Sequence, residues 1–265
     1  MSHTPALGAR VAADPCFVYG DAVAHNTARE NARIARTARY MLPEFRRRHQ
    51  RVELDAVAAY SITSTALSHQ TAELVAGCLC RDGFSAAGSV ITDGTAGTGG
   101  NVFGFAAVFR HVNAVDVDAT RAQMLLHNVA TLALSNVTVF DNDVTDTAAL
   151  FAEPGFRAQG VLFLDPPWGG AGYAAHARLS LALGGVPLAD VCRAWAPHAP
   201  YIALKLPCNF AFAAFAAATA DCLAPVLRQD MHEPGARNCA FVLLVLRARR
   251  GGARPWPKSH RASGA

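Results

Sequence analysis

The stretch SVITDGTAGTGGNVFGFAAVF, from Ser89 to Phe109, decides the fold class. Its first five residues form a short run with β-branched side chains that ends in an acid, which is typical of a buried strand. A glycine-rich turn follows, and glycine lets the chain turn sharply and allows a ligand to approach the backbone closely. The apolar segment from Asn101 onward predicts a helix. A strand, a glycine turn and a helix in this order predict a unit of a parallel α/β sheet.

The same alternation continues along the chain. A helix from Ala66 to Cys80, capped by Ser68, precedes it, and the strands and helices that follow imply right-handed crossovers. The last two strands have no evident helix between them, so we expect an antiparallel final strand. The sequence predicts a Rossmann-like α/β fold with a mostly parallel, doubly wound, seven-stranded sheet. The expected strands cover 89–93, 112–118, 137–143, 160–167, 201–207, 224–231 and 239–249, and the expected helices cover 101–109, 119–134, 188–195 and 209–220, with a short one near Ala148.

The composition is that of an apolar but folded protein. Of 265 residues, 52% are hydrophobic and 17% are charged, and the formal net charge is +4. This charge is compatible with a nucleic-acid partner but does not require one. Basic residues cluster at 46–51 and 247–261. We therefore expect a helical, basic accessory region over 1–60, the α/β domain over 61–249, and a basic tail over 250–265.

Neither the N-terminus nor the cysteines indicate export or a bound metal. The first residues lack the sustained apolar core of a signal peptide, and no stretch reaches the ~20 apolar residues that a membrane span needs. The seven cysteines are irregularly spaced, which favours reduced thiols in an intracellular protein over a zinc site. We expect a monomer without a metal ion, and the sequence does not distinguish nucleus from cytoplasm.

Three predicted strands end in carboxylates that would meet at one edge of the sheet. Asp93 ends the first strand, Asp116 the second and Asp143 the third. Because open α/β sheets bind ligands at the carboxyl ends of their strands, these acids predict a nucleoside site. Asp116 would bind ribose hydroxyls, and Asp143 suits an adenine amino group. A dinucleotide and S-adenosylmethionine both fit, but Asp93 would repel a pyrophosphate and attract a methionine ammonium, which favours S-adenosylmethionine.

The stretch VLFLDPPWGG, from Val161 to Gly170, predicts a second site beside the first. Two prolines cannot continue a central strand, so they fix a rigid loop after it. Trp168 would offer a flat face to a planar group, while Asp165 and the carbonyl of Pro166 would accept hydrogen bonds from an exocyclic amine. Gly169 keeps the approach open. Acceptors at such an amine hold its lone pair in line with a methyl sulfonium, so these residues predict methyl transfer by direct displacement.

These motifs resemble those of the RNA cap guanine-N2 methyltransferase family, the trimethylguanosine synthase group. The resemblance covers roughly 61–249 and is densest from Asp93 to Tyr173. It implies S-adenosylmethionine as cofactor, RNA with a 7-methylguanosine cap as partner, and stacking of the cationic 7-methylguanine on Trp168. Together with the positions of these residues, the resemblance implies that the catalytic residues are Asp165, Pro166 and Trp168. It implies that the cofactor-binding residues are Asp93, Thr95, Gly97, Gly99, Asn101, Asp116, Asp143 and Asp165. It implies that the substrate-binding residues are Trp168, Gly169, Tyr173, Asn128 and Lys205, with Lys205 at a cap phosphate.

One departure from the family pattern keeps two other functions open. Asp165 stands where the family usually has serine, and Asp-Pro-Pro-Trp is also the signature of methyltransferases that act on adenine N6. An N6-adenine methyltransferase on DNA or RNA is therefore the alternative enzyme. A catalytically silent cap-binding module is the alternative from another class, although the acids of both predicted sites are present.

Overall fold

The computed structural model describes residues 17–18, 52–55, 58 and 61–249. The predicted helix and basic cluster at 46–51 of the accessory region lie outside the described residues, and so does the predicted tail at 250–265. From the described part of the accessory region, two short strands pair in parallel, β1 (Phe17–Val18) and β2 (Val52–Glu53).

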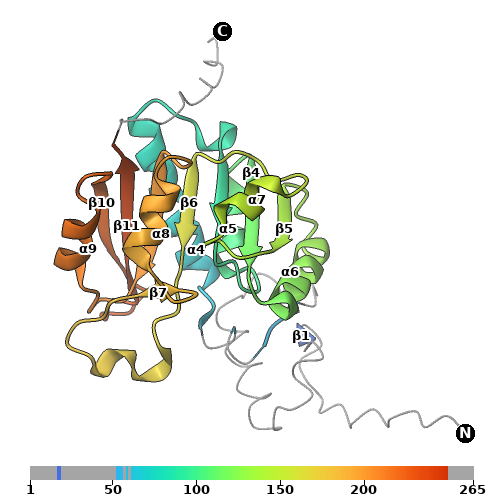
Figure 1. The fold of residues 1–265 in the computed structure, drawn as a ribbon. Coiled ribbons are helices and arrows are strands. Elements are labelled where there is room, and N and C mark those ends of the chain that lie inside the picture. The colour runs from blue at the N-terminus through green and yellow to red at the C-terminus, as the bar shows by residue number, and fades with distance from the viewer. Residues whose placement is uncertain (1–16, 19–51, 56–57, 59–60, 250–265) are drawn as a thin grey trace, which may run out of the picture.

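One seven-stranded sheet forms the centre of residues 61–249 (Figure 1). The strand order is β10-β11-β9-β6-β3-β4-β5. Every pair of neighbours is parallel except those of β11, which is antiparallel to both β9 and β10. The predicted mostly parallel sheet with an antiparallel last strand is confirmed. The strands are β3 (Val90–Asp93), β4 (His111–Asp116), β5 (Val137–Asp141), β6 (Val161–Leu164), β9 (Tyr201–Leu206), β10 (Leu223–Met231) and β11 (Phe241–Ala248).

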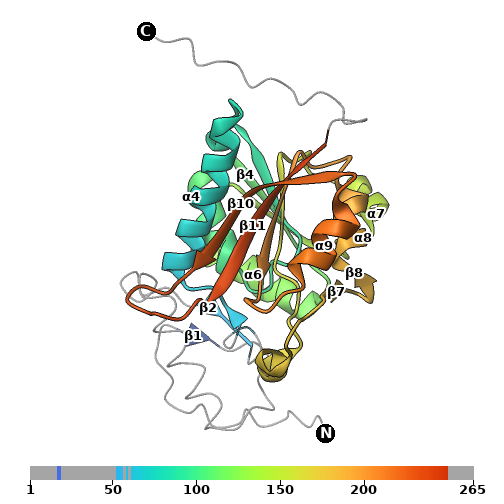
Figure 2. The same cartoon turned by 90° about the vertical axis from the view of Figure 1, so that its left-hand side faces the viewer.

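Helices cover both faces of this sheet, as the doubly wound topology requires. Figure 2 shows α4 on one side of the sheet and α7, α8 and α9 on the other. The buried core on the α4 side also contains side chains of α5 and α6. Among the described residues, none of the helices combines the length and apolar character needed to cross a bilayer. The helices are α4 (Thr65–Arg81), α5 (Gly100–Val108), α6 (Ala119–Thr131), α7 (Thr147–Ala152), α8 (Leu188–Trp195) and α9 (Phe212–Thr219), and the short elements η2 (Ala86–Gly88), η3 (Gly170–Ala175), β7 (Ala182–Leu183) and β8 (Val186–Pro187) were not predicted.

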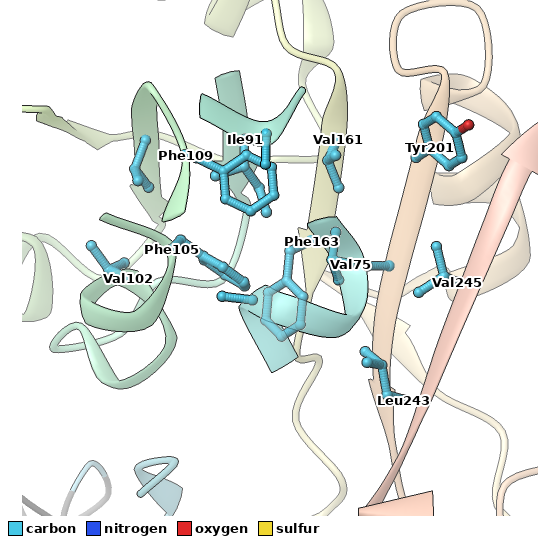
Figure 3. Close-up of a cluster of buried hydrophobic side chains, with 14 of the residues drawn as sticks. Val75, Ile91, Val102, Phe105, Phe109, Val161, Phe163, Tyr201, Leu243 and Val245 are labelled. Carbon is cyan, nitrogen blue, oxygen red and sulfur yellow. The ribbon is translucent and has the colours of Figure 1, made fainter. Parts of the chain in front are cut away.

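The side chains of β6 alternate between two buried cores, which explains why this strand is apolar throughout. Val161 and Phe163 lie in the core that contains α4 and α5 (Figure 3), and the two leucines of the strand lie in the core on the opposite face. The ring of Phe163 packs edge-on against Phe105, with their centroids 4.9 Å apart. A shift of one residue would exchange the side chains between the cores, so the packing fixes the position of Asp165 after the strand.

Helix α4 begins at Thr65, one residue before the predicted start, but its N-cap lies one turn before the predicted one. Its N-cap is Ser64, whose Oγ accepts a hydrogen bond from the Leu67 N–H at 3.3 Å. The predicted cap, Ser68, is instead fully buried inside the helix. Its Oγ accepts from the Gly104 N–H at 3.0 Å and donates to the Asn101 carbonyl at 3.1 Å. The prediction was wrong because both serines suit a cap locally, and only the contact with α5 buries the second one.

Candidate active site

The strand order reverses between β3 and β6, and the carboxyl ends of these strands form the candidate site. The loop after β3 is bonded to the strands on both sides of it. The Gly94 N–H donates to the Phe163 carbonyl, and the Ala96 N–H donates to the Val115 carbonyl, both at 2.9 Å. Open α/β sheets bind ligands at such a point, so the two predicted motifs meet where a ligand is expected.

Asp93 is a buried carboxylate with one unused oxygen. Its Oδ1 accepts from the Thr95 N–H at 3.1 Å, whereas its buried Oδ2 has no hydrogen-bond partner among the described residues. Burial raises the pKa of this carboxyl to about 8, and the nearby carboxylates of Asp165 and Asp116 act in the same direction. An unpaired buried acceptor is costly, so the site favours a ligand that brings a donor, above all a cationic one.

Asp116 ends β4 and supports the glycine loop. Its Oδ2 accepts from the Gly97 N–H at 2.7 Å, and its Oδ1 accepts from the Asp118 N–H at 3.0 Å. Burial raises the pKa of Asp116. Each carboxylate oxygen can accept a second hydrogen bond, so a ribose hydroxyl can still bind here. The neighbouring Val117 is apolar yet 70% exposed; sequence reasoning missed this residue, although an apolar residue between two acids after a buried strand was a usable signal.

Asp143 has a local structural role at the turn after β5. Its Oδ1 accepts from both the N–H and the hydroxyl of Thr145, each at 2.8 Å. Its Oδ2 lies near the β7–β8 turn, where a Cβ built on Gly184 would be 3.6 Å away. An adenine amino group would therefore have to bind Asp143 through Oδ2.

Replacement of Gly97 and of Gly99 by alanine should affect different properties of the protein. Both have positive φ, +54° and +112°, so alanine adds a strain of about 1–2 kcal/mol at either position. A Cβ on Gly99 would also lie 2.6 Å from the ring of Phe103, whereas a Cβ on Gly97 meets no atom within 4 Å. We expect Gly99→Ala to cost a further ~1–3 kcal/mol of folding free energy through overpacking, and Gly97→Ala to act mainly on cofactor affinity.

Urea unfolding and calorimetric titration with S-adenosylhomocysteine measure these two effects separately. Gly83→Ala is a matched control for backbone strain, since Gly83 has φ +82° with no atom near a built Cβ and lies two residues after the end of α4, outside the glycine loop. Equal cofactor affinities in the Gly97→Ala and Gly83→Ala variants would contradict the idea that the ligand approaches the backbone at Gly97.

Asp165, the first residue after β6, is held from several sides. Its N–H donates to Thr95 Oγ1 at 2.7 Å, which ties the second motif to the glycine loop. Its Oδ2 lies 2.6 Å from Lys205 Nζ, and the side chain of Asn101 also donates to the carboxylate. Burial raises the pKa of Asp165, while Lys205 and Asn101 act in the opposite direction. Pro166 is buried directly behind it, so the carboxylate stands on a rigid backbone.

Lys205 is buried against Asp165. Its side chain is 8% exposed, and its Nζ also donates to Thr63 Oγ1 at 2.9 Å. The ammonium group lies 5.7 Å from the ring centroid of Trp168 and 5.2 Å from that of Phe241. The position of Lys205 therefore does not support the predicted phosphate contact, because a carboxylate, a hydroxyl and two rings already surround the ammonium group.

Trp168 and Tyr173 lie together in the loop between β6 and β7. Their ring centroids are 5.1 Å apart and their planes meet at 72°. The indole Nε1 is buried and has no acceptor among the described residues. Gly169 and Gly170 follow with φ of +90° and +76°, and no atom lies within 4 Å of a Cβ built on either. Trp168 and Tyr173, each predicted to bind substrate, are thus brought together beside a stretch that side chains leave open.

Asn209 holds the far end of this loop and was not predicted. Its Nδ2 donates to the carbonyl of Tyr173 at 3.0 Å and to that of His176 at 2.7 Å. These bonds join the loop after β9 to η3. Sequence offered no signal for this residue, because a contact between two irregular loops has no periodic pattern.

Asn128 is fully buried, and its amide is engaged with the backbone. Its Nδ2 donates to the carbonyls of Glu53 and Thr98, both at 2.9 Å, and its Oδ1 accepts from the Glu53 N–H at 2.6 Å. A salt bridge of 3.0 Å between Arg121 and Asp55 supports the same contact. Asn128 thus ties β2 to the glycine loop, and its position does not support the predicted role in substrate binding.

Comparison with known proteins identifies a matching family and two similar curated proteins. A family model described as RNA cap guanine-N2 methyltransferase matches residues 88–247, more than half of the chain. The chain is 36% identical over 125 residues to an uncharacterized protein of Acanthamoeba polyphaga mimivirus, covering 46% of this chain and 48% of that one. It is 33% identical over 125 residues to the trimethylguanosine synthase of Schizosaccharomyces pombe, covering 45% and 51%. The chain spans about half the length of these curated relatives.

Similar solved structures include methyltransferases of RNA. A 16S rRNA N2 methyltransferase of T. thermophilus, in complex with S-adenosylmethionine and guanosine, has a TM-score of 0.48 and 14% identity, over 69% of this chain and 43% of that chain. An rRNA methylase of Streptococcus thermophilus has a TM-score of 0.46 and 13% identity, over 68% and 95%. The family match spans both motifs of the site and the sheet that carries them, and the chain therefore belongs to the RNA cap guanine-N2 methyltransferase family, whose members are S-adenosylmethionine-dependent methyltransferases.

Proposed function

We propose that this protein transfers a methyl group from S-adenosylmethionine to the exocyclic N2 of a 7-methylguanosine RNA cap. The observation that carries the proposal is the placement of Asp165. Its carboxylate lies between Lys205 and Asn101, and its backbone is bonded to the glycine loop through Thr95. An acceptor for an amine is therefore held directly beside the proposed cofactor site, and membership of the family supports a cap guanine as the base.

S-adenosylmethionine fits the residues at the ends of β3 and β4. Its ammonium group would bind the unpaired Oδ2 of Asp93 in a charge-assisted hydrogen bond. Its ribose hydroxyls would donate to Asp116, and its adenine would lie on the exposed side chain of Val117, with the amino group near Asp143. When bound, the cofactor supplies an electrophilic methyl group.

Trp168 would stack on the methylated base. A 7-methylguanine ring is cationic, and an indole face attracts a cationic ring more strongly than a neutral one. Gly169 and Gly170 leave space beside the indole, and Tyr173 borders it. This arrangement favours a cap over an internal, unmethylated guanine.

The charge on Asp165 favours guanine over adenine. An ionised carboxylate has acceptors but no donor. The Watson–Crick edge of guanine presents two adjacent donors, N1–H and N2–H, whereas adenine presents one donor beside the lone pair of its N1. The adenine lone pair would be repelled by a carboxylate oxygen. Asp165 therefore supports the cap base even though Asp-Pro-Pro-Trp is shared with enzymes that act on adenine.

Asp165 would also orient the amine and stabilise the developing charge. The N2 lone pair of guanine is delocalised into the ring, so N2 is a weak nucleophile. A carboxylate that accepts a hydrogen bond from N2 holds the amine in line with the methyl group and stabilises the positive charge that develops on N2. The same carboxylate is the nearest acceptor for the proton that N2 loses. The rigid backbone at Pro166 keeps this acceptor in place.

We also propose that the accessory region at 1–60 and the tail at 250–265 contact phosphates of the capped RNA, and that 61–249 is the methyltransferase domain. The basic clusters at 46–51 and 247–261 support this division. Neutralised phosphates release counterions, so RNA affinity should fall steeply as the salt concentration rises.

Product analysis tests the proposed function. RNA with a 7-methylguanosine cap, RNA with an unmethylated guanosine cap and uncapped RNA are incubated with labelled S-adenosylmethionine, digested to nucleosides and analysed by mass spectrometry. We expect N2-methylated 7-methylguanosine from the first RNA and no product from the uncapped RNA. N6-methyladenosine as the product would overturn the choice of guanine, and cap binding without methyl transfer would favour the silent binding module.

Replacement of Trp168 by alanine should weaken binding of a 7-methylguanosine cap analogue. Stacking contributes about 1–3 kcal/mol per base, which corresponds to about 5- to 150-fold in affinity. Isothermal titration measures this change, with Trp168→Phe expected to retain most of the affinity. Binding of S-adenosylhomocysteine serves as the control for folding. Unchanged cap affinity in the alanine variant would exclude the stacking role.

A further inference from the structure

Lysine is rare in this chain. Of the 24 Lys and Arg residues, Lys205 and Lys258 are lysines and the others are arginines. Lys205 lies on β9, whose register with β6 pairs Leu204 with Leu164. The next residues along the two strands are Lys205 and Asp165, which therefore face each other at the carboxyl edge. A lysine at this place brings one compact ammonium group to the carboxylate.

The ammonium group of Lys205 is enclosed by partners. It lies 2.6 Å from Asp165 Oδ2 and 2.9 Å from Thr63 Oγ1, and the rings of Phe241 and Trp168 lie over it. Burying an ammonium group is costly even when it is paired with a carboxylate. Two leucine-sized side chains would fill this space at a lower cost, so the pair is better explained by what it does for the Asp165 carboxylate than by stability.

We propose that Lys205 is the positioning residue for the methyl acceptor: it keeps the Asp165 carboxylate charged and fixed, so that the carboxylate accepts the N–H groups of the base. This inference rests on the proposed function, because it takes Asp165 as the group that contacts the amine. It adds a residue that acts through Asp165 and does not itself touch the substrate.

The charges around Asp165 explain why such a residue is needed. Asp93 on β3 lies close enough to Asp165 and to Asp116 on β4 for their charges to raise its pKa. From β9, Lys205 supplies the positive charge, and from α5, Asn101 supplies a neutral donor. Burial favours the protonated carboxyl, which would donate a hydrogen bond to the amine where an acceptor is required. Lys205 is the group among the described residues that opposes this effect of burial with a full charge.

The pair also accounts for the departure from the family pattern. A serine at position 165 is neutral, so it would need no counter-ion in a buried site. An aspartate there needs one, and Lys205 provides it across the adjacent strand. Asp165 and Lys205 therefore act as one unit, and changing one residue should be tolerated better when the other is changed with it.

A double-mutant cycle on stability tests the unit without any substrate. Unfolding by urea is compared in the wild type, Lys205→Met, Asp165→Asn and the double variant. Breaking the buried pair from one side should lower the folding equilibrium constant at least about 10-fold, and the double variant should recover most of this loss. A loss of stability in the double variant that equals the sum of the losses in the two single variants would show that Asp165 and Lys205 do not act as one unit.

The pH dependence of methyl transfer tests the positioning role. The ratio kcat/KM is measured from pH 5 to pH 9 with the methyl acceptor that the wild type uses, whether a cap or an adenine. Loss of the Lys205 charge should move the acid limb of the Lys205→Met profile upward by about 1–3 pH units. Lys205→Arg keeps the charge, so its acid limb should stay at the wild-type pH even if kcat falls. Arg247→Met is the matched control, because Arg247 pairs with Asp82 at 2.9 Å on the far edge of the sheet.

The outcomes separate this inference from the proposed function. Equal acid limbs in the wild type and Lys205→Met would overturn the role of Lys205 while leaving cap methylation intact. Methylation of adenine in place of the cap, with the limb displaced as expected, would overturn the proposed substrate and retain Lys205. A lack of methyl transfer to every acceptor would overturn both.

Discussion

Replacement of Asp165 by alanine is expected to lower kcat for cap methylation about 10²- to 10³-fold, the loss typical of removing one preorganised group that stabilises transition-state charge. The carboxylate is held by Lys205 at 2.6 Å and by the Thr95 hydroxyl through its backbone. It is therefore fixed before the substrate binds, and its loss removes both the alignment of N2 and the acceptor for the developing charge. Single-turnover kinetics with capped RNA measure this effect on the chemical step.

The binding steps should change little in the same variant. Trp168 and the glycine loop keep their own contacts, so we expect affinities for a cap analogue and for S-adenosylhomocysteine within a few-fold of the wild type. Because alanine leaves Lys205 without its carboxylate, the double variant Asp165→Ala/Lys205→Met controls for folding. Asp221→Ala controls for loss of an aspartate, since Asp221 is exposed and lies at the opposite edge of the sheet. A loss of kcat below tenfold would contradict the role of Asp165.

Replacement of Asp93 by asparagine should weaken binding of S-adenosylmethionine about 10- to 150-fold, because a hydrogen bond to a charged group contributes about 1.5–3 kcal/mol. The unpaired Oδ2 of Asp93 is the acceptor that the ammonium group would use. The carboxyl has a pKa of about 8 in the ligand-free protein, so it must lose its proton when the ammonium group binds. Wild-type affinity should therefore rise between pH 6 and pH 7.5, and that of Asp93→Asn should stay flat. Isothermal titration across this range measures both, and a pH-dependent Asp93→Asn variant would contradict the assignment.

The same substitution should stabilise the ligand-free protein at high pH. The folded pKa of Asp93, about 8, lies above the ordinary value of 3.8, so the folded state binds the proton more tightly. The stability from this carboxyl is fully present below about pH 4 and is lost as the pH rises through about 8. Asparagine cannot ionise and avoids that loss. We expect Asp93→Asn to exceed the wild type at pH 8.5 by at least about 1 kcal/mol, or about 2–4 °C in Tm, with the difference vanishing below about pH 4.

Local pattern was sufficient to predict which residues lie at the edge of the sheet. Asp93, Asp116 and Asp165 each lie near the end of a predicted strand, and parallel strands bring their carboxyl ends to the same edge. The strand predictions worked because the central strands β3, β4, β6 and β9 are buried along their whole length. The glycines and prolines that follow β3 and β6 restrict the backbone within a few residues. The side-chain contacts at this edge were less predictable, as Asn128 and Lys205 illustrate.

By itself, the sequence determined the fold class, the edge of the sheet at which the candidate site lies and the residue types that gather there, because these follow from apolar periodicity and backbone restrictions within short segments. The tertiary structure alone decided that Lys205 pairs with Asp165, 40 residues away, and that Asn128 bonds to Glu53, 75 residues away. Those pairings depend on which strands become neighbours and in what register. Strand order and register are set by the packing of the whole sheet against its helices, which no local stretch of sequence contains.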